Sequence, residues 1–151
     1  MAKTRFEDFL DFAIRNEIEA ARIYERSAAI CIMAAQKQLL EKLATMERGH
    51  ETILKQVRDG RSSSLLGQKA PRDLHLSDFL VETAISPDSP IEDVMVFSIK
   101  AEQKAYDLYS SLAKLEEDPE TKALLLKLAS EEKKHKFDLE TQFEKGFMKE
   151  N

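Results

Sequence analysis

The feature that most constrains this chain is an internal repeat. When the 151-residue sequence is compared with itself at a shift of 85 positions, residues 7–55 align with residues 92–140 without a gap, and 17 of the 49 aligned pairs are identical. Unrelated segments agree at far fewer positions, even when both are rich in Leu, Glu and Lys. Because 151 residues make one domain of ordinary size, the repeat predicts a single domain, residues 1–151, built from two similar halves.

Each half is expected to fold as a helical hairpin. The chain has only 4 Gly and 4 Pro, and its apolar residues recur at the i, i+3, i+4, i+7 spacing of an amphipathic helix. Asp118-Pro119 interrupts the pattern of the second half, because proline favours a first helical turn and its predecessor resists helix. The repeat places the first turn near residues 33–35. The expected helices are 4–32, 36–58, 90–115 and 119–147.

Residues 59–89 are expected to connect the two hairpins. Gly, Ser and Pro are frequent in this segment, and residues 74–85 could form a short helix that begins near Ser77. About 30 residues is long for a loop in a compact domain. A connection of this length is needed if the second and third helices are parallel, because the chain must then return along the whole bundle. The predicted fold is therefore all-α, a four-helix bundle with hairpins at 4–58 and 90–147 and one long crossover.

Glutamates interrupt the apolar stripe of every expected helix. Burying an unpaired carboxylate costs several kcal/mol, and four buried close together repel one another. Either these carboxylates hold protons and share hydrogen bonds, or cations lie among them. Two divalent cations would balance four carboxylates. The residues concerned are Glu17, Glu47, Glu102 and Glu132.

Two of these glutamates begin Glu-x-x-His motifs, Glu47 to His50 and Glu132 to His135. Residues three apart lie on one face of a helix, so both side chains of a motif can bind one ion. The motif follows the upstream glutamate by 30 residues in both halves, which places all six side chains at one level of the bundle. A glutamate from each of two helices and Glu-x-x-His from the other two resembles the ligand set of di-iron and di-manganese carboxylate bundles. Iron, manganese or zinc suits such oxygen and imidazole ligands.

The same stretches resemble the rubrerythrin branch of the ferritin-like superfamily, over both hairpins. The resemblance rests on residues 16–24 (NEIEAARIY), 46–50 (MERGH), 101–109 (AEQKAYDLY) and 131–135 (EEKKH). It implies a ferritin-like fold, a non-haem site with two iron ions per chain, reaction with hydrogen peroxide or dioxygen, and a homo-oligomer, with a dimer favoured. In the expected site Glu47 and Glu132 bridge the ions, and each ion has one terminal glutamate and one histidine.

Two features of the chain depart from what the resemblance implies. Rubrerythrins carry a rubredoxin domain that holds iron on four cysteines, and this chain has one cysteine. Electrons are therefore expected from a separate protein such as a rubredoxin. Rubrerythrins also have a further carboxylate three residues after the glutamate of the third helix, where this chain has Ala105.

Three further residues bear on the expected site. Tyr24 and Tyr109 each follow a site glutamate by seven residues on the same face. Each is a core tyrosine, a hydrogen-bond donor to a ligand carboxylate across the bundle, or both. Glu131 lies four residues before His135 and could replace Glu132 as the ligand, but the repeat pairs Glu131 with Met46, which favours Glu132.

Composition narrows the class of protein and its compartment. The net charge of −5 disfavours nucleic acid and anionic membranes as partners. No apolar run approaches the roughly 20 residues of a membrane span. A single cysteine cannot form an internal disulfide, and the acidic N-terminal segment is unlike a signal peptide. These features predict a cytoplasmic protein.

Three functions are compatible with the predicted site. The first is an oxidoreductase of the rubrerythrin kind, in which peroxide or dioxygen oxidises a diferrous site. The second is iron handling, meaning ferroxidation or transport without a role in peroxide reduction. The third is a bundle in which the metals, such as zinc, are structural and undergo no redox turnover.

Overall fold

The computed structural model describes residues 4–60, 63–82 and 84–145, and within them the chain forms four long α-helices. Each helix is 25 residues long, and one short 3-10 helix, η1, lies between the second and third. The elements are α1 (Phe6–Ile30), α2 (Ala34–Arg58), η1 (Leu76–Phe79), α3 (Ile91–Leu115) and α4 (Pro119–Phe143). No strand occurs in these ranges, so the predicted all-α fold is confirmed.

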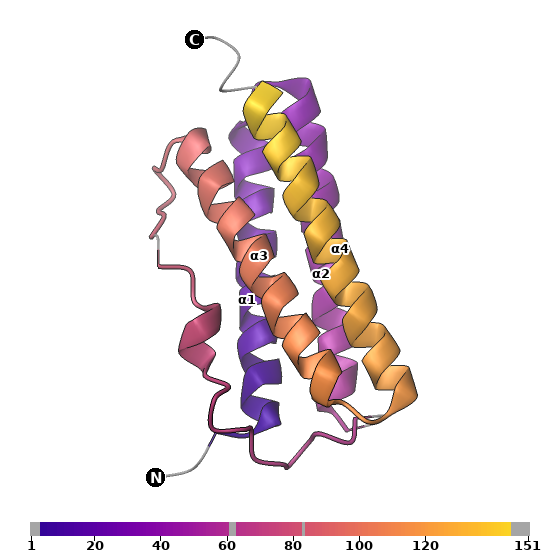
Figure 1. Ribbon diagram of the computed structural model, residues 1–151. Helices are drawn as coiled ribbons and strands as arrows, with labels where there is room; N and C mark the ends of the chain where they lie inside the picture. The colour runs from indigo at the N-terminus through magenta and orange to yellow at the C-terminus, as the bar shows by residue number, and fades with distance from the viewer. Residues whose placement is uncertain (1–3, 61–62, 83, 146–151) are drawn as a thin grey trace.

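The four helices form a bundle of two hairpins (Figure 1). α1 packs mainly against α2 and α3 mainly against α4, while α1–α3 and α2–α4 contacts join the hairpins. α2 and α3 run in the same direction, and the connection between them climbs along the outside of the bundle from the end of α2 to the start of α3. The single long crossover of the predicted fold is confirmed.

The helix boundaries follow the 85-residue repeat more closely than expected. α1 and α3 begin at 6 and 91 and end at 30 and 115, while α2 and α4 begin at 34 and 119 and end at 58 and 143. The first turn lies at 31–33, two residues earlier than the expected 33–35, because the backbone is already extended at Cys31 and α2 begins directly after Met33.

Three other boundaries differ from the expected ones. α1 begins at Phe6 rather than residue 4, because the chain before it pairs with the connection: Thr4 O accepts from Ala70 N, and Phe6 N donates to Gln68 O. α3 begins one residue later than expected, after Pro90 as its N-cap. α4 ends at Phe143, and the expected end at 147 lies outside the described residues.

The helix expected at 74–85 is much shorter. One 3-10 turn forms, with His75 rather than Ser77 as its N-cap, and the backbone is extended again at Leu80. So short a helix gains little from its own hydrogen bonds. Phe79 holds it to the bundle, since its buried ring packs edge-on against Phe9 with 6.2 Å between ring centroids. Residue 83 of the expected helix lies outside the described residues.

Two apolar clusters fill the two ends of the bundle. One includes Phe9, Leu54, Leu112 and Leu125, and the other includes Leu40, Leu43, Met95 and Leu139. On every helix, the residues between these clusters include a glutamate of the predicted site, and α2 and α4 also have a histidine there. The apolar ends thus make the bundle rigid on both sides of a polar middle layer.

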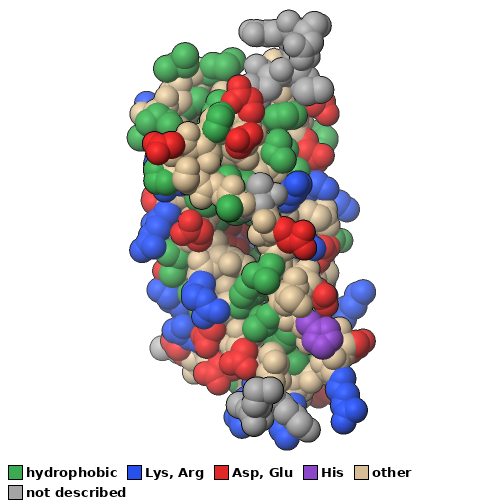
Figure 2. Space-filling model, turned by 90° about the vertical axis from the view of Figure 1, so that its left-hand side faces the viewer, with side chains coloured by type: hydrophobic (Ala, Val, Ile, Leu, Met, Phe, Trp, Pro, Cys, Tyr) green, Lys and Arg blue, Asp and Glu red, His purple; other side chains and the backbone are tan. Residues whose placement is uncertain are grey.

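The surface is largely polar. Figure 2 looks onto the face along which the connection runs, where charged and hydrophobic side chains alternate. Within the described residues, no helix combines the length and apolar character that crossing a membrane requires.

Glu116 holds the connection to the turn between α3 and α4. Its buried carboxylate accepts hydrogen bonds from Ser63 Oγ at 2.6 Å, from Ser64 N at 2.9 Å and from Ser64 Oγ, and from Asp118 N at 3.0 Å. Burial acts to raise the pKa of Glu116, but these hydrogen bonds outweigh burial and the pKa lies below its usual value of 4.5. The ionised carboxylate therefore stabilises the fold.

We predict that Glu116→Gln lowers the free energy of unfolding by about 1–3 kcal/mol at neutral pH, because it replaces charge-assisted hydrogen bonds with neutral ones. Since the folded pKa lies below the unfolded one, this stabilisation is complete above about pH 4.5 and is lost as the pH falls through the folded pKa. Urea unfolding at several pH values measures the difference. The exposed neighbour Glu117→Gln is the matched control, and equal effects of the two variants would contradict the prediction.

Candidate metal centre

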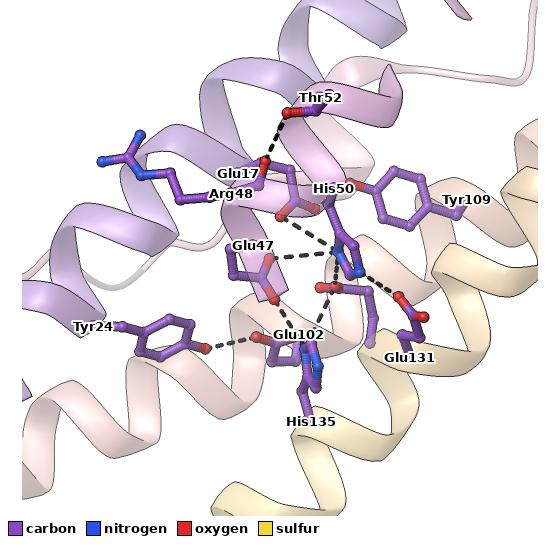
Figure 3. Close-up of polar contacts among 11 residues, drawn as sticks. Glu17, Tyr24, Glu47, Arg48, His50, Thr52, Glu102, Tyr109, Glu131 and His135 are labelled. Atoms are coloured by element: carbon purple, nitrogen blue, oxygen red, sulfur yellow. Dashed lines mark hydrogen bonds and ion pairs between the residues drawn. The ribbon is translucent and has the colours of Figure 1, made fainter. Parts of the chain in front are cut away.

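The structure brings the six predicted site side chains together in the polar middle layer of the bundle, as Figure 3 shows for those that it labels. All six are nearly fully buried. They supply two overlapping groups of potential ligand atoms, and within each group the atoms lie within 4.8 Å of one another. The first group is Glu17, Glu47, His50 and Glu132, and the second is Glu47, Glu102, Glu132 and His135.

The two groups share Glu47 and Glu132, and each has its own histidine. His50 Nδ1 lies 2.6 Å from Glu132 Oε1, 3.7 Å from Glu17 Oε2 and 3.8 Å from Glu47 Oε2. His135 Nδ1 lies 2.9 Å from Glu47 Oε1 and 3.6 Å from oxygens of both Glu102 and Glu132. The imidazole rings are nearly parallel, at 14°, with centroids 5.7 Å apart. The arrangement has the approximate two-fold symmetry of the sequence repeat.

Two buried tyrosines connect the hairpins through the cluster. The Tyr24 hydroxyl of α1 donates to Glu102 Oε1 of α3 at 2.6 Å, and the Tyr109 hydroxyl of α3 donates to Glu17 Oε1 of α1. Burial, followed by the charge of the facing glutamate, raises the pKa of both phenols well above 10.0, so both remain protonated donors. Each bond occupies one carboxylate oxygen and leaves the other directed toward the centre.

Several atoms at the centre have no hydrogen-bond partner within the described part of the protein. They are Glu17 Oε2, Glu102 Oε2, Glu132 Oε1 and His50 Nδ1. His50 Nδ1 and Glu132 Oε1 are close but do not have the direction of a hydrogen bond. A buried unsatisfied polar atom costs about 1–3 kcal/mol, so four around one space need a common partner. Oxygen and imidazole nitrogen atoms converging in this way fit divalent metal ions.

The electrostatics of the cluster also indicate missing positive charge. Burial, then repulsion from Glu102 and Glu17, raises the pKa of Glu47 and of Glu132 well above 4.5. Burial acts in the same direction on Glu17, but the neighbouring side chains of Glu47 and His50 outweigh burial and lower the pKa of Glu17. Four carboxylates cannot all be ionised here without cations, because like charges this close repel strongly.

Glu131 and Glu132 lie on different sides of His50. Glu132 lies in the cluster, whereas Glu131 has 27% of its side chain exposed and lies behind His50, with its Oε2 atom 2.6 Å from His50 Nε2. The sequence did not predict this contact, because it depends on how α2 and α4 face each other. His135 Nε2 has no corresponding partner among the described residues.

A cavity of about 180 Å³ opens beside the cluster, between α1 and α3. The four glutamates line it but neither histidine does, so it lies on the carboxylate side of the centre. Its other walls are mainly apolar, with Phe79, Leu80 and Val81 of the connection at one side. Ala105 and its repeat equivalent Ala20 also line this space. The sequence alone does not indicate that the connection lines this space.

Comparison with solved structures agrees with the fold. The chain is similar to a hypothetical protein from Pyrococcus furiosus, with 25% identity, a TM-score of 0.73 and coverage of 91% of this chain and 87% of that one. It is also similar to the crystal structure of a Thermotoga maritima protein described as ferritin-like and diiron-carboxylate, with 20% identity, a TM-score of 0.80 and coverage of 95% and 97%. No curated protein matches the sequence.

The sequence profile of one family spans almost the whole bundle, matching residues 8–143 from the first turn of α1 to the end of α4. It covers both hairpins, the connection and all six side chains of the cluster. The chain therefore belongs to the Rubrerythrin family and has the ferritin-like four-helix fold.

Proposed function

We propose that the protein is a non-haem di-iron oxidoreductase that reduces hydrogen peroxide or dioxygen. The observation that carries this proposal is the pair of overlapping ligand groups with four unsatisfied donor atoms directed at one buried space. Membership of the Rubrerythrin family supports iron as the metal. Manganese or zinc would also suit these ligand atoms.

The ligand roles follow from which residues the two groups share. Glu47 and Glu132 would bridge the two ions, Glu17 and His50 would complete one position, and Glu102 and His135 the other. Two divalent ions would balance the four carboxylates and displace the protons that burial favours on Glu47 and Glu132. When bound, ferrous iron supplies the electrons that reduce the oxidant.

The remaining residues would orient the ligands and admit the oxidant. Tyr24 and Tyr109 hold the terminal glutamates in place from the opposite hairpin. The cavity gives a small oxidant access to the carboxylate side of the centre, and its apolar walls limit the water there. Ala105 leaves this side open where a further carboxylate is expected in rubrerythrins.

The chain would need partners to turn over. Its single cysteine cannot supply a rubredoxin-type site, so we infer that a separate electron donor such as a rubredoxin re-reduces the centre. A homodimer in the cytoplasm, protecting the cell from oxidative stress, is the setting that we propose.

One observation favours an alternative, ferroxidation or iron handling. This chain has Ala105 at the position where rubrerythrins have the carboxylate that supports a change of ligand on oxidation. The size of the protein in solution would distinguish an iron-storage cage from a small oligomer. A structural role for bound zinc would instead leave the centre without redox activity.

Anaerobic loading with ferrous iron tests the proposal. We predict two irons per chain and their conversion to the diferric state by peroxide within seconds, because six ligands fix both ions in a site open to the oxidant. Metal analysis and the visible absorption spectrum measure these quantities. His50→Gln should lose iron, whereas the exposed His75→Gln should not. Oxidation no faster than that of free ferrous iron would contradict the proposal.

Tyr24→Phe tests the orienting role of the tyrosines. Removal of one hydroxyl leaves Glu102 Oε1 buried without its donor, so we expect ferrous iron to bind about 10-fold more weakly and to oxidise more slowly. Competition with a chelator measures the affinity. Tyr106→Phe on α3 is the control, since Tyr106 is half-buried and outside the cluster. An unchanged affinity and oxidation rate in Tyr24→Phe would remove Tyr24 from the site.

A further inference from the structure

We propose that the two metal positions are inequivalent, and that Glu131 makes the position of His50 bind its ion first and more tightly. The inference rests on the proposed di-metal function. It adds an order of filling and assigns Glu131 as the positioning residue that sets it.

The asymmetry lies on the outer side of the two histidines. His50 Nε2 is 2.6 Å from Glu131 Oε2, whereas His135 Nε2 is buried without a hydrogen-bond partner among the described residues. On the inner side both Nδ1 atoms face the carboxylates of the cluster. The two halves therefore agree at the ligands and differ directly behind them.

The sequence repeat shows which residues cause this difference. At the shift of 85 residues, His50 matches His135 and Glu47 matches Glu132, but Glu131 matches Met46. The residue of α2 that corresponds to Glu131 is thus a thioether, which accepts hydrogen bonds only weakly. One half of a nearly symmetric site has the carboxylate and the other lacks it.

The carboxylate favours the metal-binding form of its histidine. A histidine that binds a metal through Nδ1 carries its proton on Nε2, and an acceptor there fixes the tautomer and increases the basicity of Nδ1. Glu131 supplies that acceptor to His50. The same tautomer of His135 would direct a buried N–H at no acceptor.

On the inner side, each of the two histidines contacts one shared glutamate. The Nδ1 atom of His135 is within hydrogen-bond distance of Glu47 Oε1, at 2.9 Å. His50 Nδ1 likewise lies 2.6 Å from Glu132 Oε1, so the asymmetry lies behind the two imidazole rings and not on their inner side. Glu131 thus places a fifth carboxylate beside the position of His50, behind its ring.

Zinc titration of the full chain, labelled with ¹⁵N in its three histidines, tests the order of filling. Zinc serves as a diamagnetic probe that binds imidazole and carboxylate. We expect the ring nitrogens of His50 to shift during the first equivalent and those of His135 during the second, with affinities about 10–100-fold apart. The exposed His75 should not shift.

Two reciprocal variants make the halves alike. Glu131→Met should weaken the first site about 10–100-fold, so that both histidines shift together. Met46→Glu should strengthen the second site, and both should then shift together at high affinity. Glu140→Met removes an exposed charge from α4 and should leave the order unchanged. Thermal melting of the apo proteins verifies that each variant is folded. If Met46→Glu does not fold, Glu131→Met alone tests the proposal.

The outcomes separate this inference from the proposed function. Uptake of two equivalents with parallel shifts in the unaltered protein would overturn the inequivalence and leave the di-metal site intact. Preference for His50 that persists in Glu131→Met would overturn the role of Glu131. Failure to bind zinc and iron at all would overturn the di-metal function, and this inference with it.

Discussion

Repulsion among four buried carboxylates is the constraint on which this structure depends. Glu17, Glu47, Glu102 and Glu132 occupy the middle of a bundle whose two ends are apolar. Burial disfavours their ionisation, and each ionised group makes the next more costly. The two histidines and the two tyrosine hydroxyls satisfy only part of this set, because four atoms at the centre still lack hydrogen-bond partners in the described residues. Divalent cations would satisfy both the charge and the geometry.

The internal repeat made much of the fold predictable from the sequence. Equal spacing of 30 residues in both halves placed the six side chains at one level, and the structure brings them together there. The repeat also relates every helix boundary. Asp118-Pro119 marks the second turn, so the start of α4 at Pro119 corresponds to the start of α2 at Ala34, although no proline or glycine marks that position.

What could not be predicted depends on how elements face one another across space. The contact between Glu131 and His50 joins α4 to α2, and no periodicity within one helix reveals it. A short helix within the connection was considered at 74–85, but the described residues of this range form only one turn, which is held in place by Phe79 packing on Phe9. Its next residues help to wall the cavity beside the carboxylates. The two-fold symmetry of the ligands is thus broken by the surroundings, through Met46 on one side and the connection on another.

A crystal structure of the iron-loaded protein, with anomalous differences measured at the iron absorption edge, tests the central claim most directly. We expect two anomalous peaks per chain in the middle of the bundle, both within bonding distance of Glu47 and Glu132, with His50 at one peak and His135 at the other. A single peak, or iron bound only at surface carboxylates while the six buried side chains bond to one another, would contradict this expectation.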